Sequence, residues 1–228
     1  MNELYHTILD WSEVWALLIP LAFVLFKKNK SAYLRPLKIY VWVALILNVG
    51  AISIWLSNRL NFSNMPDFLQ SNNFLYNTHS IVRLLLFSWF FILLNQRFMH
   101  RIKAGLPFLF ILLAIINFIF FEDFFNYDML SSRLLATEAA ILLFYCLQYF
   151  IYLMIDDKGT SLRKYPGFWV ITCLSIYVSA NFFIFLFYNY LITKNLKLFA
   201  VNIWDVHNIV FILLCIGLAI ELNKKHEH

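Results

Sequence analysis

The stretch Pro166–Tyr190, PGFWVITCLSIYVSANFFIFLFYNY, decides the fold class of this chain. It contains no Asp, Glu, Lys or Arg, and a helix that crosses a bilayer needs about 20 mostly apolar residues. A membrane-spanning strand would be shorter and would alternate polar with apolar residues. The stretch therefore predicts a transmembrane helix.

The composition of the whole chain agrees with this prediction. Hydrophobic residues make up 62% of the 228 residues and charged residues only 14%, whereas a soluble domain is about 45–50% apolar and about 25% charged. A soluble fold of this length leaves roughly 30% of its chain surface exposed, so much of this apolar surface would face water. We therefore exclude a soluble enzyme, a disordered chain and a nucleic-acid-binding domain.

Apolar stretches of similar length recur along the chain. We place them at residues 8–26, 37–57, 74–94, 106–121, 131–155, 166–190 and 198–222. The sequence thus predicts an all-α, polytopic membrane protein, a seven-transmembrane-helix bundle that forms a single membrane domain over residues 1–228. Its first partner is the lipid bilayer.

The basic residues predict the orientation of the bundle. Thirteen of the 18 Lys and Arg residues lie in residues 27–38, 97–103, 158–164 and 224–225, and three lie in the connections at the other end. Because basic loops stay in the cytoplasm, we expect the N-terminus outside and the C-terminus in the cytoplasm. The net charge of +5 then reflects topology, and we expect no nucleic-acid partner.

Several ionisable residues lie inside the predicted spans and share one depth. A charge at the bilayer centre costs about 2.5–3.5 kcal/mol, so it usually faces a partner or a cavity. Four of these residues fall in the first two turns of helices that run inward, and Arg83 lies one turn below one of them. The predicted ligand-binding residues are Glu13, His79, Arg83, Glu138, Tyr145, Asn181 and Asp205.

Two interpretations of these residues remain open. They form either an outward-facing polar pocket for a small ligand or a set of interhelical pairs that hold the bundle together, such as Arg83 with Glu138 or Asp205. His207 is placed outside the set, because two residues after Asp205 is about 200° around the helix.

Three other chemistries can be compared on the same residues. Retinal is not expected, because the last span has no internal lysine between Lys197 and Lys224; no other cofactor is assigned. A metal-dependent intramembrane lipid hydrolase would use Glu13, His79 and Asp205 as metal ligands, but the chain has no H-x-x-x-H motif.

A small-solute transporter is the stronger alternative. Against it, the spans lack the Gly and Pro breaks typical of discontinuous transport helices, and their cytoplasmic halves are apolar. An enzyme is the least favoured class. We therefore expect a receptor-like or accessory sensing membrane subunit, which binds a small ligand from the outer side and signals through a partner.

Four regions carry a resemblance to known sequences. They are Asn77–Arg83, Glu138–Phe150, Tyr165–Asn181 and Ile203–Asn208. They resemble uncharacterised integral membrane proteins of Bacteroidetes bacteria, which are often encoded beside sensor histidine kinases. The resemblance implies a bacterial inner-membrane location, a role in signalling and a histidine kinase or other membrane protein as partner.

Overall fold

A computed structural model of the chain describes residues 2–27, 31–60, 66, 69–96, 98–126, 129–155 and 161–224. Every regular element in these ranges is a helix, which confirms the all-α prediction for this part of the chain. The elements are α1 (Asn2–Asp10), α2 (Ser12–Phe26), η1 (Ala32–Leu34), α3 (Arg35–Arg59), α4 (Asn73–Leu93), α5 (His100–Phe120), α6 (Ser132–Ile155), η3 (Leu162–Lys164), α7 (Phe168–Thr193) and α8 (Lys197–Asn223).

Five helical segments of the described chain are long and apolar enough to cross a membrane. They are Ala32–Arg59, His100–Phe120, Ser132–Ile155, Phe168–Thr193 and Leu198–Asn223. The apolar helix α2 has only 15 residues, and α4 has 21 residues but carries polar side chains in its first half. The chain thus has the helices of a membrane protein, whereas the predicted count of seven spans rests on α2 and α4.

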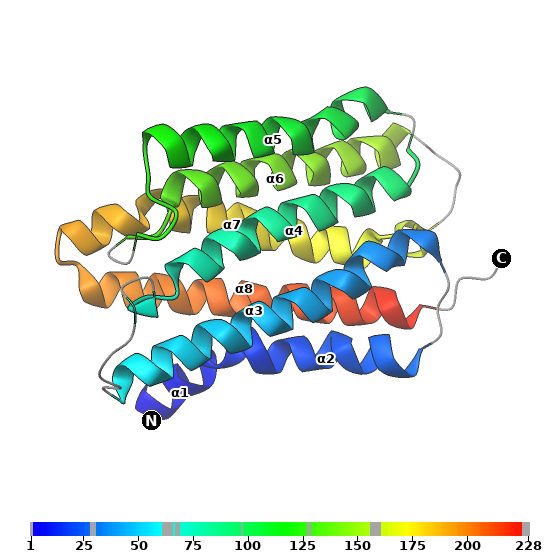
Figure 1. The fold of residues 1–228 in the computed structure, drawn as a ribbon. Helices are drawn as coiled ribbons and strands as arrows, with labels where there is room; N and C mark the ends of the chain where they lie inside the picture. The colour runs from blue at the N-terminus through cyan, green and yellow to red at the C-terminus, as the bar shows by residue number, and fades with distance from the viewer. Residues whose placement is uncertain are drawn as a thin grey trace.

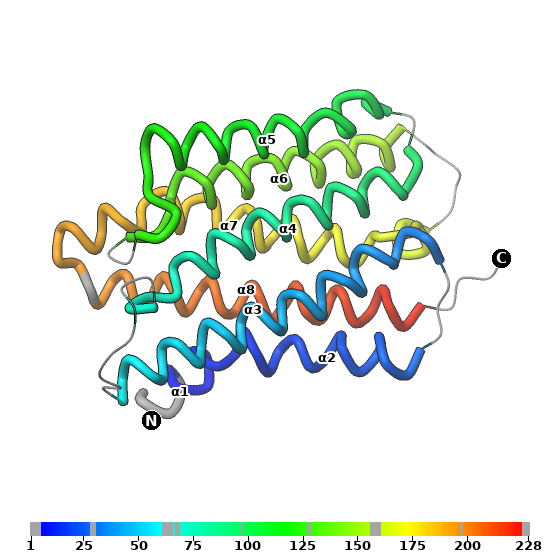
Figure 2. The backbone as a smooth tube through the Cα atoms, viewed as in Figure 1, coloured from blue at the N-terminus to red at the C-terminus, as the bar shows by residue number. Residues whose placement is uncertain are grey.

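The long helices run side by side and form one bundle (Figure 1). The helix α8 packs mainly against α7 and α2, and α4 lies between α3, α5 and α6. Helix α1 and the last turn of α8 lie at opposite ends of the bundle (Figure 2). We call these the N-terminal end, where α1 lies, and the C-terminal end.

The fourth long helix, α5, differs most from its expected bounds of 106–121. It begins at His100, so Pro107 lies inside the helix instead of opening it. A proline in a helix frees the carbonyl four residues before it, which here is that of Lys103. The Tyr145 hydroxyl of α6 donates a 2.6 Å hydrogen bond to this carbonyl, and so the helix continues through the proline.

This contact gives Tyr145 a structural role, and the role can be tested. We expect Tyr145→Phe to lower the free energy of unfolding by about 1 kcal/mol, because the Lys103 carbonyl then lacks its partner. In a Pro107→Ala background the backbone amide restored at position 107 can bond this carbonyl, so the same substitution should cost much less. A double-mutant cycle in a denaturing-detergent titration measures this difference. Equal costs in the two backgrounds would contradict the explanation.

A buried carboxylate holds the helices together at the C-terminal end. Glu221 of α8 is fully buried and accepts hydrogen bonds from the Gly167 amide at 2.7 Å and the Tyr33 hydroxyl at 3.1 Å. Gly167 has φ of +80°, a left-handed conformation that glycine adopts without strain. Since α7 begins at Phe168, the Pro166–Gly167 turn precedes the helix and does not form its first turn.

The run 8–26 is divided at Trp11 between the end of α1 and α2, and the remaining apolar runs became helices close to where they were expected. The run 74–94 corresponds to α4, 131–155 to α6 and 198–222 to α8. Some basic residues used to predict the orientation lie outside the described residues: Lys28, Lys30, Arg97, Lys158 and Lys225.

Candidate functional site

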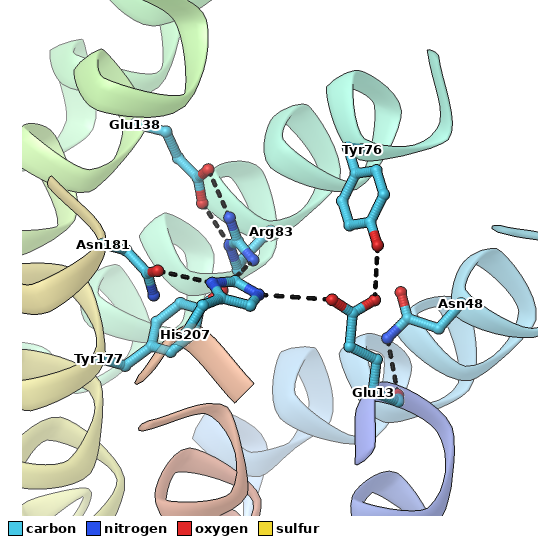
Figure 3. Close-up of polar contacts among 8 residues, drawn as sticks. All are labelled: Glu13, Asn48, Tyr76, Arg83, Glu138, Tyr177, Asn181 and His207. Carbon is cyan, nitrogen blue, oxygen red and sulfur yellow. Dashed lines mark hydrogen bonds and ion pairs between the residues drawn. The ribbon is translucent and has the colours of Figure 1, made fainter. Parts of the chain in front are cut away.

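Polar side chains from six helices meet inside the bundle (Figure 3), and Glu13 in the first turn of α2 places the group nearer the N-terminal end. We call this group the central polar cluster: Glu13 of α2, Asn48 of α3, Tyr76 and Arg83 of α4, Glu138 of α6, Tyr177 and Asn181 of α7, and His207 of α8. The helix α5 contributes no residue to this group. Since Glu138 and Asn181 are each only 1% exposed, the cluster includes fully buried polar groups.

The first half of the cluster is an ion pair between α4 and α6. Arg83 donates two hydrogen bonds to the Glu138 carboxylate, at 2.5 and 2.7 Å. Its remaining terminal nitrogen donates to the Tyr177 hydroxyl of α7 at 2.6 Å. This geometry satisfies the guanidinium at both of its edges, which is what a buried arginine requires. The expected pairing of Arg83 with Glu138 is present.

The second half of the cluster centres on Glu13. Its carboxylate accepts a 3.0 Å hydrogen bond from the Tyr76 hydroxyl and lies 3.5 Å from Nε2 of His207. The Asn48 amide donates to the Glu13 backbone carbonyl at 2.8 Å. Glu13 therefore links α2 to α3, α4 and α8.

His207 connects the Glu13 half of the cluster to α7. Its Nδ1 lies 2.6 Å from Oδ1 of Asn181 on α7, so both ring nitrogens face oxygen atoms. The Trp204 ring stacks on the imidazole with a centroid distance of 4.9 Å. These contacts fix the ring in one orientation, as preorganised sites require.

A cavity just large enough for one water molecule lies within the cluster. Its volume is about 10 Å³, and Glu13, His79, Arg83 and His207 are among its lining residues. A single water needs roughly 10–15 Å³ and several polar partners. The buried Nε2 of His79 has no hydrogen-bond partner among the described residues, and a water in this cavity would supply one.

A second, larger cavity opens above Glu13 at the N-terminal end. It has a volume of about 160 Å³ and is lined by Asp10, Trp11, Glu13, Ile52, Trp55, Asn72, Tyr76 and Trp204. We call it the vestibule. Asp10, Trp11 and Trp55 are exposed at its rim, whereas Glu13 is 6% exposed. Because Glu13 and Tyr76 line both cavities, Glu13 separates the vestibule from the water-sized cavity.

Two predicted site residues lie away from the central polar cluster. Asp205 faces α1, where its carboxylate lies 3.0 Å from Nδ1 of His6. Tyr145 lies two turns below Glu138 and stacks on Phe91 with a centroid distance of 4.9 Å. The other five predicted residues are Glu13, His79, Arg83, Glu138 and Asn181, and they line the water-sized cavity or belong to the cluster.

The sequence interpretation missed four residues of the cluster: Asn48, Tyr76, Tyr177 and His207. His207 was placed outside the site because it lies opposite Asp205 on the helix. That angle is correct, but it is His207 that faces the core. A signal was available, since His207 lies in line with Phe211, Leu214 and Leu218, all buried residues at core spacing.

The proposed metal ligands are not gathered into one site. Among the described residues no group of three His, Cys, Asp or Glu side chains could hold a metal ion. Glu13 and His79 line the same small cavity, but Asp205 turns toward His6. A zinc site needs at least three protein ligands around one point, and Glu13, His79 and Asp205 do not provide it.

The geometry is therefore that of a buried central polar cluster below an open vestibule.

Comparison with known proteins finds no family model, no curated protein and no solved structure that matches this chain.

Proposed function

We propose that this protein is a receptor-like membrane subunit of the bacterial inner membrane, which binds a small ligand in the vestibule and signals through a partner. The observation that carries the proposal is the position of Glu13. This residue lies at the floor of the vestibule and contacts α3, α4 and α8 through polar groups. A ligand that alters the Glu13 contacts therefore acts on several helices at once.

The proposed topology has seven crossings with the N-terminus outside. The helices α2 and α4 lie alongside the five long apolar helices (Figure 1), so they cross the membrane if their neighbours do. The 15 residues of α2 span only about 22 Å of the roughly 30 Å hydrocarbon layer. Either the bilayer is thinner around α2, or α1 lies at the membrane interface and completes the crossing. The basic loops then lie in the cytoplasm, and the vestibule opens to the outside.

The helix α8 provides a route from the vestibule to the C-terminal end. It carries His207 beside Glu13 and, 14 residues or about 21 Å later, the fully buried Glu221. Glu221 binds the turn before α7 and the hydroxyl of Tyr33. Since one rigid helix joins both contacts, a shift at His207 changes the packing at the cytoplasmic side, where a partner such as a sensor histidine kinase would respond.

The packing below the cluster favours reception over transport. Buried rings follow one another toward the C-terminal end: Tyr40 contacts Phe87 at 5.0 Å, Phe90 contacts Phe91 at 5.4 Å, and Phe91 stacks on Tyr145 at 4.9 Å. All five rings are at most 1% exposed. A solute moving through the bundle would have to displace this fully buried aromatic layer, and close-packed interiors resist such displacement.

The coupling can be tested without knowing the ligand. We expect Glu13→Gln to raise amide hydrogen exchange in residues 161–167 and 221–224 by about threefold or more, because each lost interhelical contact is worth about 0.6 kcal/mol. The matched control is Glu122→Gln, a carboxylate at the same end that contacts Asn117 and Ser131 instead. The measurement is exchange mass spectrometry on the protein in nanodiscs.

Two results would contradict the proposal. Exchange that changes only near Glu13 would mean that the cluster holds the helices together without linking the two ends. Uptake of a labelled solute into proteoliposomes, above that of protein-free vesicles, would instead support a transporter.

A further inference from the structure

The chemistry of the vestibule indicates what kind of ligand it binds. Its polar lining consists of two carboxylates, one amide and one phenol, and three tryptophan rings provide most of the remainder. No Lys, Arg or His is among the described residues that line it. Such a combination of aromatic faces and negative charge attracts cations and offers no positive charge to an anion.

We propose that the vestibule binds a small organic ammonium ion, with the tryptophan and tyrosine rings around it and the Glu13 and Asp10 carboxylates facing its charge. This deepens the proposed receptor function, since it names the ligand class of the same site. The group could belong to a free ammonium solute or to a phospholipid headgroup, which share this chemistry.

The Glu13 carboxylate brings negative charge to the floor of the vestibule and keeps one oxygen without a hydrogen bond. One oxygen accepts the Tyr76 hydroxyl, but the other receives no hydrogen bond from the described residues and has His207 at 3.5 Å. This distance is longer than that of a charge-assisted hydrogen bond. A buried carboxylate with an unsatisfied oxygen at the floor of a cavity is suited to a cationic ligand.

The aromatic residues are placed to surround a cation. Trp204 and Tyr76 meet edge to face at 5.7 Å, and Trp11 and Trp55 are exposed at the rim. The Trp55 ring already has the Arg59 guanidinium at 5.3 Å, so it attracts positive charge in this protein. Arg59 itself is not among the vestibule lining residues.

The size of the vestibule fits this ligand class. Its volume is about 160 Å³, and a protein cavity of roughly 150 Å³ holds one benzene molecule. Choline, ethanolamine and tetramethylammonium have comparable numbers of heavy atoms. Larger polyamines or peptides would extend beyond the rim.

The charges around Asp10 predict how binding depends on pH. Burial and the nearby Asp205 raise the pKa of the Asp10 carboxyl, His6 opposes this, and Glu13 adds to it. A cation binds the ionised carboxylate, so its affinity should fall as the pH drops through the raised pKa of Asp10. Asp10→Asn should weaken binding at neutral pH and reduce this pH dependence.

The direct test is a choline titration of the purified protein in lipid-free detergent, followed by calorimetry and tryptophan fluorescence. We expect saturable binding of choline, and at least about tenfold weaker binding of its neutral isostere 3,3-dimethylbutan-1-ol, since only choline gains the charge interactions. Both Glu13→Gln and Trp55→Leu should weaken choline binding by about tenfold. Trp55 is partly exposed, so its replacement keeps the test valid if Glu13→Gln does not fold. Trp89→Phe is the control, because Trp89 is not among the vestibule residues and has Arg35 over its ring.

The same choline titration in nanodiscs of two lipid compositions identifies the source of the ammonium group. Equal choline affinity in phosphatidylcholine and phosphatidylglycerol nanodiscs supports a free solute, and weaker affinity in phosphatidylcholine supports a lipid headgroup. Equal binding of choline and its neutral isostere, or unchanged binding in both vestibule variants, overturns the proposal. These outcomes are independent of the hydrogen-exchange test, which uses no ligand. Coupling between the two ends without choline binding would leave a receptor for another ligand class. Choline binding without such coupling would leave a binding site that does not signal.

Discussion

Replacing Arg83 by methionine should lower the free energy of unfolding by about 3–5 kcal/mol, the largest effect that we expect from a single substitution in this chain. The guanidinium makes two hydrogen bonds to Glu138 and a third to Tyr177, and Glu138 is 1% exposed. Removal of the arginine leaves the Glu138 carboxylate buried without its counter-ion. The carboxylate must then become protonated, draw in water or separate the helices, and each response costs free energy.

A double substitution distinguishes the pair from the packing around it. We expect Arg83→Met together with Glu138→Met to recover most of the lost stability, because no unpaired charge remains and only the Tyr177 hydroxyl loses a partner. Unfolding of the single and double variants in a denaturing-detergent titration gives the coupling energy. If the double variant were as unstable as the sum of the two single variants, the ion pair would not be the source of the effect.

The positions of the helices were largely predictable because apolar run length determines them. The runs 74–94 and 131–155 differ from α4 and α6 by one residue at the most. The start of α5 was not predictable in the same way, since a proline is equally compatible with a first turn and with a supported helix interior. The support comes from Tyr145 on another helix, and no local pattern specifies that contact.

The position of the site along the bundle was predictable, but its membership was only partly so. Because a buried charge is costly, Glu13, Arg83 and Glu138 were expected near one another in the bundle. The structure brings all three to the central polar cluster. A helical wheel gives the angle between Asp205 and His207, yet it does not say which of them faces the core. That choice depends on how α8 rotates against α7 and α2, and the stripe that His207 shares with Phe211 was the better guide.

The vestibule could not be found from local patterns at all. Its residues come from five separate parts of the chain, at positions 10–13, 52–55, 72, 76 and 204. Tryptophans near span ends are typical of a membrane interface, so Trp11, Trp55 and Trp204 gave no sign of enclosing a cavity. Only the packing of α1, α2, α3, α4 and α8 brings them together.

The second large effect is expected at Gly217 of α8. This glycine lies against α7, with no room for a side chain. A Cβ at this position would lie 2.7 Å from the Cβ and Sγ atoms of Cys173 and 3.0 Å from the Trp169 carbonyl oxygen. Small residues permit such close approach between membrane helices. We expect Gly217→Ala to lower the free energy of unfolding by about 1–3 kcal/mol, because the two helices must separate to relieve the overlap.

The chain offers a matched control for Gly217→Ala. Gly105 of α5 has no atom within 4 Å of its added Cβ, so Gly105→Ala should stabilise the protein by up to about 1 kcal/mol through helix propensity alone. Cys173→Gly should restore part of the stability lost in Gly217→Ala, whereas Cys173→Ala should restore less, because it keeps the Cβ that causes the overlap. Thermal unfolding of these variants in detergent measures the order. Equal effects of alanine at positions 217 and 105 would mean that α7 and α8 are not packed at this distance, and the route from His207 to Glu221 along α8 would then lack α7 as a fixed partner.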